Sequence, residues 1–170
     1  MKFVLLNGAS CSGKSTILKE VLKQKNRLFH LSYDATKWMF SGYAPATHVE
    51  DVQKVLVSIA TTVFELDYDV VTDSVISKEW REDLIQLARR HGYEIVEVNL
   101  EADYEVLAKR FEERIEGASK DPERKISNRS KERFKEIFDT FEREKNPSAT
   151  TFRTDVQSVE EISEGVSQLL

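Results

Sequence analysis

Residues 8–15 read Gly8-Ala9-Ser10-Cys11-Ser12-Gly13-Lys14-Ser15, and Thr16 follows them. This stretch fits the pattern G-x-x-x-x-G-K-[ST] without a gap. Glycines let the backbone wrap closely enough to point successive amides at phosphate oxygens, and the helix that follows presents its positive N-terminal end. In such a loop Lys14 would reach the β and γ phosphates, and the Ser15 hydroxyl would ligate Mg²⁺. We therefore predict that residues 8–16 bind a nucleotide; the alternative is a flexible Gly/Ser turn.

The segments on either side of this stretch favour the phosphate-binding interpretation. An apolar run at 3–6 is typical of a strand buried on both faces, and it breaks at Asn7-Gly8. Downstream, apolar residues recur at helical spacing at Ile17, Leu18, Val21 and Leu22. A strand, a loop and an amphipathic helix in that order are the context that the motif requires.

The rest of the chain alternates between short apolar runs and helical stripes. Further strands are predicted at 28–31, 70–72, 95–100 and 150–152. Helical periodicity covers 52–64, 80–88, 107–115, 134–141 and 158–169, the last opening with a capping box of Ser158 and Glu161. This order predicts the α/β class: a three-layer P-loop NTPase fold with a five-stranded parallel sheet, helices on both faces, and ligands at the carboxyl ends of the strands.

Length and composition narrow the class of protein. A chain of 170 residues suits one domain spanning residues 1–170. A net charge of −5 disfavours a protein that coats duplex nucleic acid by bulk electrostatics. The single cysteine, Cys11, excludes an internal disulfide framework and favours a reducing, cytoplasmic compartment. The N-terminal apolar run is too short for a signal peptide, and no stretch approaches transmembrane length, so we expect no membrane association.

Two acids follow predicted strands at the edge where ligands are expected. Asp34 comes after the second strand, where a carboxylate could accept the proton of an acceptor hydroxyl as it attacks phosphorus; alternatively it caps a short helix starting at Ala35. Asp73 ends the run Val70-Val71-Thr72-Asp73 and could hold Mg²⁺, although Asp also suits turns. Trp38 and its aromatic neighbours could wall an acceptor pocket or pack in the core. The three histidines, including His30, lack metal-ligand spacing and are interpreted as structural.

Basic residues concentrate in the second half of an otherwise acidic chain. Phosphoryl transfer needs cations near the charge that develops on the transferred group. Arg110 and Arg114 lie one helical turn apart and share a face, so they are candidates for this role. The alternative is a salt-bridged surface, because glutamates are interspersed among the basic residues. Residues 116–129 form the one long polar stretch of loop composition, where a lid could lie.

The sequence resembles the small P-loop kinases, a group that includes chloramphenicol phosphotransferase and polynucleotide kinase. The likeness lies in four places: Leu5-Leu6-Asn7-Gly8 running into Ser12-Gly13-Lys14-Ser15, Tyr33-Asp34, Val71-Thr72-Asp73-Ser74, and Leu107-Ala108-Lys109-Arg110 to Arg114. The segment from Asn146 to Asp155 is similar to the last strand and the adenine-side loop of these kinases. Residues 41–51 match no acceptor-binding segment of the group.

The resemblance implies roles for particular residues. Arg110 would flank adenine, Arg114 would reach the phosphates from the lid side, and Thr154 would lie in the adenine-side loop. We therefore expect an ATP- and Mg²⁺-dependent kinase that transfers the γ-phosphoryl group to a hydroxyl of a small molecule. A kinase for the 5′-hydroxyl of a polynucleotide is the first alternative. A nucleotide-dependent switch or binding module is the second, although no Asn-Lys-x-Asp guanine-reading motif is present.

Overall fold

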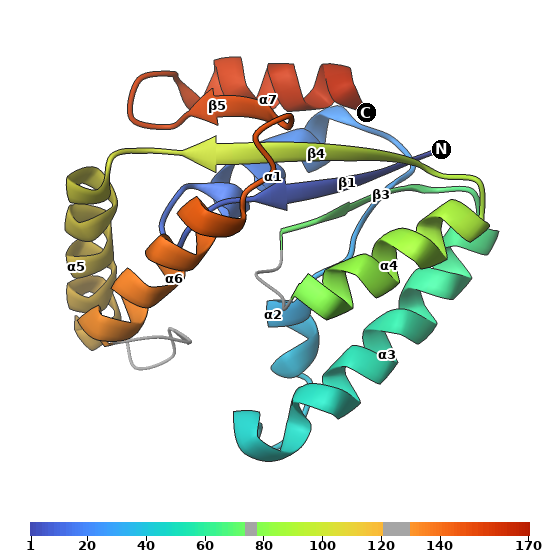
Figure 1. Cartoon of the computed structure of the whole chain (residues 1–170), viewed down its shortest axis with the longest axis horizontal. Helices are drawn as coiled ribbons and strands as arrows, with labels where there is room; N and C mark the ends of the chain where they lie inside the picture. The colour runs from blue at the N-terminus through green and yellow to red at the C-terminus, as the bar shows by residue number, and fades with distance from the viewer. Residues whose placement is uncertain (74–77, 121–129) are drawn as a thin grey trace.

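The computed structural model describes residues 1–73, 78–120 and 130–170. Within them lies one parallel sheet of five strands in the order β2-β3-β1-β4-β5 (Figure 1). The strands are β1 (Lys2–Asn7), β2 (Leu28–His30), β3 (Asp69–Thr72), β4 (Glu94–Glu101) and β5 (Thr150–Arg153). This arrangement confirms the predicted five-stranded parallel sheet, including its short last strand.

Helices cover both faces of this sheet and one of its ends (Figure 1). They are α1 (Lys14–Gln24), α2 (Tyr33–Lys37), α3 (Pro45–Glu65), α4 (Lys78–Arg90), α5 (Tyr104–Lys120), α6 (Lys131–Glu144) and α7 (Val159–Leu169). Helices α1 and α7 pack on one face, α3 and α4 pack on the other, and α5 and α6 lie beyond the carboxyl ends of the strands. Of the helices described, none has the length and apolar character needed to cross a membrane.

The central strand β1 shows why the sheet needs two helical layers. Phe3 and Leu5 point into the core shared with α3 and α4, whereas Val4 and Leu6 point into the core shared with α1 and α7. All four side chains are at most 2% exposed. Because burial of one such side chain contributes about 1.5–3 kcal/mol, a strand that is apolar on both faces is stable only between two layers.

Several element boundaries differ from those expected from the sequence. The helix predicted at 52–64 begins earlier, at Pro45, since proline suits the first turn of a helix. The predicted polar segment 116–129 begins as helix rather than loop: Glu116–Lys120 continue α5, where Ala118 is buried and Lys120 pairs with Glu116. The rest of the predicted lid, 121–129, lies outside the described residues. The capping box of Ser158 and Glu161 at α7 is confirmed.

Candidate nucleotide and acceptor site

The loop between β1 and α1 brings backbone atoms into close contact. A side chain at Gly8 would place its Cβ 2.7 Å from the Leu100 carbonyl oxygen and 2.4 Å from Ser12 Oγ, so only glycine fits there. Gly13 caps α1 with φ 91°, a backbone conformation that residues other than glycine adopt only at a cost in free energy. Cys11 has φ 65° and carries that cost of about 1–2 kcal/mol itself. Strain of this kind is typical of loops whose shape serves a ligand.

Lys14 turns its amine back into this loop. Its Nζ donates hydrogen bonds to the carbonyl oxygens of Gly8, at 2.7 Å, and Ala9, at 2.9 Å, and lies 3.5 Å from the buried Ser12 hydroxyl. Burial of the amine lowers the pKa of Lys14 to about 8. The loop thus holds a partly desolvated cation at its centre, where phosphate oxygens would be stronger partners than neutral carbonyls.

Three charged side chains from distant segments act on the same amine. Burial is the largest cause of the lowered Lys14 pKa, the charges of Asp73 and Asp34 oppose it, and the charge of Arg114 adds to it. Asp73 follows β3, Asp34 lies in α2, and the exposed Arg114 lies on α5. The fold therefore brings the two predicted acids and the predicted arginine near enough to Lys14 for their charges to act on its amine.

Ser15 and Asp73 offer oxygen ligands side by side. Ser15 Oγ donates to Asp73 Oδ2 at 3.4 Å. Burial alone would raise the pKa of Asp73, but the hydrogen bond and charge of His30 and the charge of Lys14 outweigh it and lower that pKa. An ionised carboxylate and a hydroxyl are hard donors that suit Mg²⁺, which is commonly held by one or two protein groups together with water and substrate phosphates. Within the described ranges, no group of three or more His, Cys, Asp or Glu side chains is placed so that it could hold a metal ion by itself.

His30, which was interpreted from the sequence as a structural residue, belongs to this site. Its Nε2 lies 2.9 Å from Asp73 Oδ1. His30 is the last residue of β2, and Asp73 follows the last residue of the neighbouring strand β3. Knowledge that the second strand pairs with the third would have identified His30, because the carboxyl ends of adjacent parallel strands meet. The chain order alone carries no such signal.

Asp34 is exposed and paired. Ser32 is the cap of α2, since its Oγ accepts a hydrogen bond from the Ala35 amide, so the alternative that Asp34 caps this helix is wrong. The Asp34 side chain is 69% exposed and forms an ion pair with Lys37, which is only 7% exposed. One carboxylate at the carboxyl end of the sheet is therefore open to solvent.

Aromatic rings surround the amine of Lys37. Its Nζ lies 5.1 Å from the ring centre of Trp38, 5.8 Å from that of Tyr33 and 6.0 Å from that of Tyr43. The Tyr33 and Tyr43 hydroxyls are 3.1 Å apart. Tyr33 and Tyr43 pack against the core, whereas Trp38 remains exposed, so core packing explains the tyrosines but not the tryptophan.

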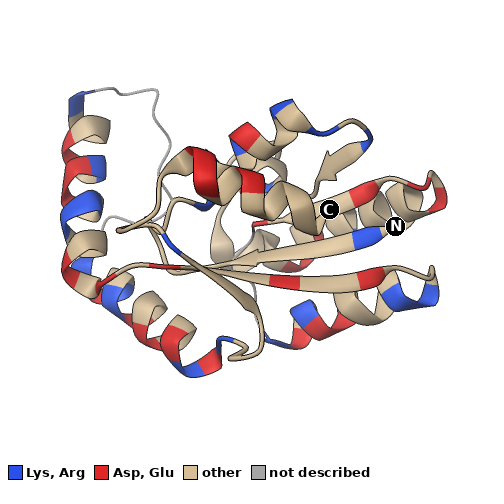
Figure 2. Ribbon diagram, turned by 90° about the horizontal axis from the view of Figure 1, so that it is seen from above, with Lys and Arg blue, Asp and Glu red and all other residues tan. Residues whose placement is uncertain are grey.

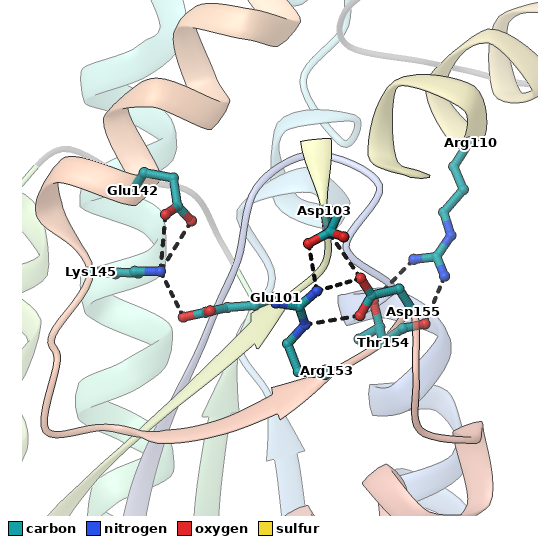
Figure 3. Close-up of polar contacts among 8 residues, drawn as sticks. All are labelled: Glu101, Asp103, Arg110, Glu142, Lys145, Arg153, Thr154 and Asp155. Carbon is teal, nitrogen blue, oxygen red and sulfur yellow. Dashed lines mark hydrogen bonds and ion pairs between the residues drawn. The ribbon is translucent and has the colours of Figure 1, made fainter. Parts of the chain in front are cut away.

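On the opposite side of the phosphate loop, Arg110 joins α5 to the turn after β5 (Figure 3). Its Nη2 donates to the Thr154 carbonyl at 2.7 Å, and its Nη1 donates to the Thr154 hydroxyl at 3.0 Å and to the Cys11 carbonyl at 3.5 Å. Thr154 also lies next to the loop, because a Cβ on Gly13 would be 3.9 Å from its methyl carbon. The two residues assigned to the adenine side are thus in direct contact.

An ion cluster braces the residues on either side of Thr154. Arg153 donates to Asp103 and to Asp155, both at 2.6 Å, and the Asp103 amide donates to Asp155 at 3.0 Å (Figure 3). The hydrogen bond with Arg153 holds the pKa of Asp155 well below its usual range. Nothing in the residue spacing indicated this cluster, which depends on the end of β4 lying beside the end of β5.

Most of the remaining basic residues on α5 and α6 have surface partners. Acidic and basic residues are interspersed along both helices (Figure 2). The ion pairs include Lys120–Glu116, Lys131–Glu112, Arg133–Glu136 and Lys135–Asp139, each at 2.6 Å. Exposed pairs of this kind contribute about 0–1 kcal/mol each, so a salt-bridged surface explains these residues without a catalytic role. Arg124, Lys125 and Arg129 lie outside the described residues.

A family model described as an AAA domain matches residues 3–143, from the start of β1 to the end of α6. The chain belongs to the AAA domain family. The match covers the phosphate loop, both acids at the sheet edge and both arginines of α5. No curated protein matches the AAA-domain chain.

Solved structures with kinase-like P-loop folds resemble this AAA domain. A proposed kinase from Chloroflexus aurantiacus has a TM-score of 0.73 at 18% identity, with 99% of this chain and 98% of that chain covered. The APS kinase CysC of Mycobacterium tuberculosis, solved with AMPPNP and APS, has a TM-score of 0.65 at 19% identity, covering 99% and 96%. A chain of the Pnkp1/Rnl/Hen1 RNA repair complex has a TM-score of 0.69 at 19% identity, covering 84% and 44%. At these identities the likeness concerns the fold.

Proposed function

We propose that the protein is an ATP- and Mg²⁺-dependent kinase that transfers the γ-phosphoryl group to a hydroxyl of a small-molecule acceptor. The observation that carries this proposal is that Asp73, which contacts Ser15 beside the phosphate loop, and the exposed Asp34 both lie near enough to Lys14 for their charges to act on its amine. In-line transfer of a phosphoryl group to a hydroxyl requires two carboxylates near the phosphates. One holds the metal ion and the other orients the acceptor hydroxyl.

Each residue of the site then has a specific task. Lys14 replaces its carbonyl partners with β- and γ-phosphate oxygens, and Arg114 reaches the transferred group from α5. Asp34 accepts a hydrogen bond from the acceptor hydroxyl and orients it toward phosphorus. Ser15 and Asp73 would hold Mg²⁺, which supplies charge neutralisation between the phosphates when it is bound.

The adenine of ATP is assigned to the side of the loop where Arg110 and Thr154 lie. A planar guanidinium held by three carbonyl and hydroxyl contacts presents a fixed face on which a base can stack. The ATP analogue bound by the structurally similar APS kinase is consistent with this nucleotide choice.

We further propose one kinase domain over residues 1–170. The family match ends at residue 143, but β5 pairs with β4 and α7 packs against the core of α1 and β1. The last 27 residues, 144–170, thus complete the same sheet and one of its covering layers. The lone Cys11 suits a reducing compartment such as the cytoplasm.

A polynucleotide 5′-hydroxyl kinase remains the alternative acceptor assignment, and the Pnkp1 complex is among the similar folds. Such an enzyme would need a cation near Asp34 to bind a nucleic-acid phosphate. Lys37 is the nearest basic residue to Asp34 in the sequence. It is buried, its amine lies over three aromatic rings, and it forms an ion pair with Asp34 itself. This pairing favours a small molecule over a polynucleotide.

The decisive experiment is transfer of labelled γ-phosphate from ATP to a fractionated metabolite extract and, in parallel, to 5′-hydroxyl oligonucleotides. We expect label in a small-molecule fraction and none in the oligonucleotides. Asp34→Asn should abolish that transfer while ATP binding is retained. Slow hydrolysis without transfer to any acceptor, unchanged in the Asp34→Asn variant, would instead support the switch or binding module.

A further inference from the structure

The Asp73 carboxylate is held at both of its oxygens by residues from different elements. Oδ1 lies 2.9 Å from His30 Nε2, and Oδ2 accepts from Ser15 Oγ at 3.4 Å. The Asp73 side chain is 11% exposed and that of His30 is 29% exposed. The imidazole reaches the carboxylate from β2, the edge strand, across the end of β3.

We propose that His30 is a positioning residue that orients the Asp73 carboxylate for the metal ion of the nucleotide complex. This inference rests on one part of the proposed function, namely that a metal–nucleotide complex binds at the phosphate loop. It does not depend on which acceptor is used. With its hydrogen on Nε2, His30 donates to Oδ1 and leaves Oδ2 directed at Ser15, the other predicted ligand. Hydrogen bonds from beyond the ligands commonly fix ligand orientation in metal sites.

An imidazole is better suited to orient the Asp73 carboxylate than the ammonium or guanidinium group of a lysine or arginine would be. Lys14 is close enough for its charge to act on Asp73, so a carboxylate free to rotate could turn toward that amine. The hydrogen bond from the imidazole fixes Oδ1 of Asp73 and leaves Oδ2 beside Ser15. A lysine or arginine in the same place would compete with the cation for the carboxylate.

The test compares the affinity for ADP with and without Mg²⁺, measured by calorimetry. We expect Mg²⁺ to strengthen ADP binding to the wild-type protein, and His30→Leu to reduce that strengthening about tenfold or more. The affinity without metal should stay unchanged. His30→Gln, whose amide nitrogen can replace Nε2, should restore most of the effect. His91→Leu is the matched control, because His91 is exposed and lies at the turn between α4 and β4.

Two further measurements separate positioning from a merely structural role. His30→Leu should have no additional effect on the Mg²⁺ dependence in an Asp73→Asn background, since the two residues act through one contact. Nitrogen chemical shifts of the wild-type imidazole should show the hydrogen on Nε2. If that hydrogen resides on Nδ1, or if His30→Leu keeps the full Mg²⁺ effect, the proposal is wrong.

Different experimental results would refute the role of His30 and the assignment of kinase activity. A wild-type protein that binds ADP with Mg²⁺ but phosphorylates no acceptor would refute the kinase assignment and leave His30 testable. A kinase whose Mg²⁺ dependence is the same in the wild-type protein and in His30→Leu would refute the role of His30 alone.

Discussion

Arg110 and Thr154 are 44 residues apart in the sequence and make two hydrogen bonds, of 2.7 and 3.0 Å. The same guanidinium lies 3.5 Å from the carbonyl oxygen of Cys11 in the phosphate loop. One side chain therefore connects α5, the turn after β5 and the phosphate loop. If the adenine binds here, the geometry of its site depends on this connection.

Replacement of Arg110 by lysine keeps the charge but removes the planar fork that reaches two oxygens at once. We expect Arg110→Lys to weaken ATP binding about tenfold, as loss of one or two charged hydrogen bonds predicts. Lys109→Ala, at the exposed neighbouring position, is the control and should bind ATP normally. Calorimetric titration measures both. Wild-type affinity in Arg110→Lys would show that these contacts do not shape the site.

The lowered pKa of Lys14, about 8, predicts that nucleotide binding is coupled to a proton. In the free protein the amine is half neutral near pH 8, whereas phosphate oxygens beside it would raise its pKa. At pH 8.5 binding should therefore take up a proton, and affinity should fall as the pH rises further. At pH 6 the amine is charged in both states and no uptake is expected.

Calorimetry of ADP binding in two buffers of different ionisation enthalpy measures this uptake. Lys14→Met should show no uptake at pH 8.5 and weaker binding at both pH values. Equal heats in the two buffers for the wild-type protein would contradict a lowered pKa in the free loop.

Because Lys37 is buried beneath aromatic rings, we predict that its replacement by methionine lowers phosphoryl transfer while leaving the stability of the protein almost unchanged. Lys37→Met keeps much of the side-chain volume and removes a buried charge, so the free energy of unfolding should change by less than about 1 kcal/mol. Asp34 loses its partner and its orientation, so phosphoryl transfer should fall about tenfold while ATP affinity is retained. Lys54→Met, at an exposed position of α3, is the matched control. Loss of ATP binding in Lys37→Met would place Lys37 on the nucleotide side instead.

The lowered pKa of Asp155 predicts that the free energy of unfolding depends on pH in the acid range. Its pKa is lowered in the folded protein, chiefly by the hydrogen bond with Arg153. The stabilisation is therefore present above the unfolded-state pKa of about 3.9 and is lost as the pH falls from there toward the folded-state pKa. Asp155→Asn should lower the free energy of unfolding by about 1–2 kcal/mol at pH 7 and by progressively less below pH 4.

Urea denaturation at pH 7, 4 and 3 checks this prediction. Glu164→Gln, at an exposed position of α7, should change stability little at any of these pH values. A constant difference between the wild-type protein and Asp155→Asn at all three values would show that the ion pair does not account for the loss.

Much of the fold was predictable because its signals are local. The run at 3–6 is apolar on both faces, the spacing at 52–64 is helical, and Ser158 and Glu161 form a capping box, each of which depends on neighbours in sequence. The start of α3 at Pro45 was missed because its first turns are polar and lack an apolar stripe. The continuation of α5 to Lys120 was missed because only Ala118 is buried there.

The sequence by itself determined the phosphate loop, because its spacing sets the path of the backbone from Gly8 to Ser15 over eight consecutive residues. Only the tertiary structure decided which side chains meet around that loop. His30 reaches Asp73 because β2 lies beside β3, and Arg110 reaches Thr154 because β5 lies beside β4. Strand order results from packing between layers distant in the chain, and no local pattern of residues records it.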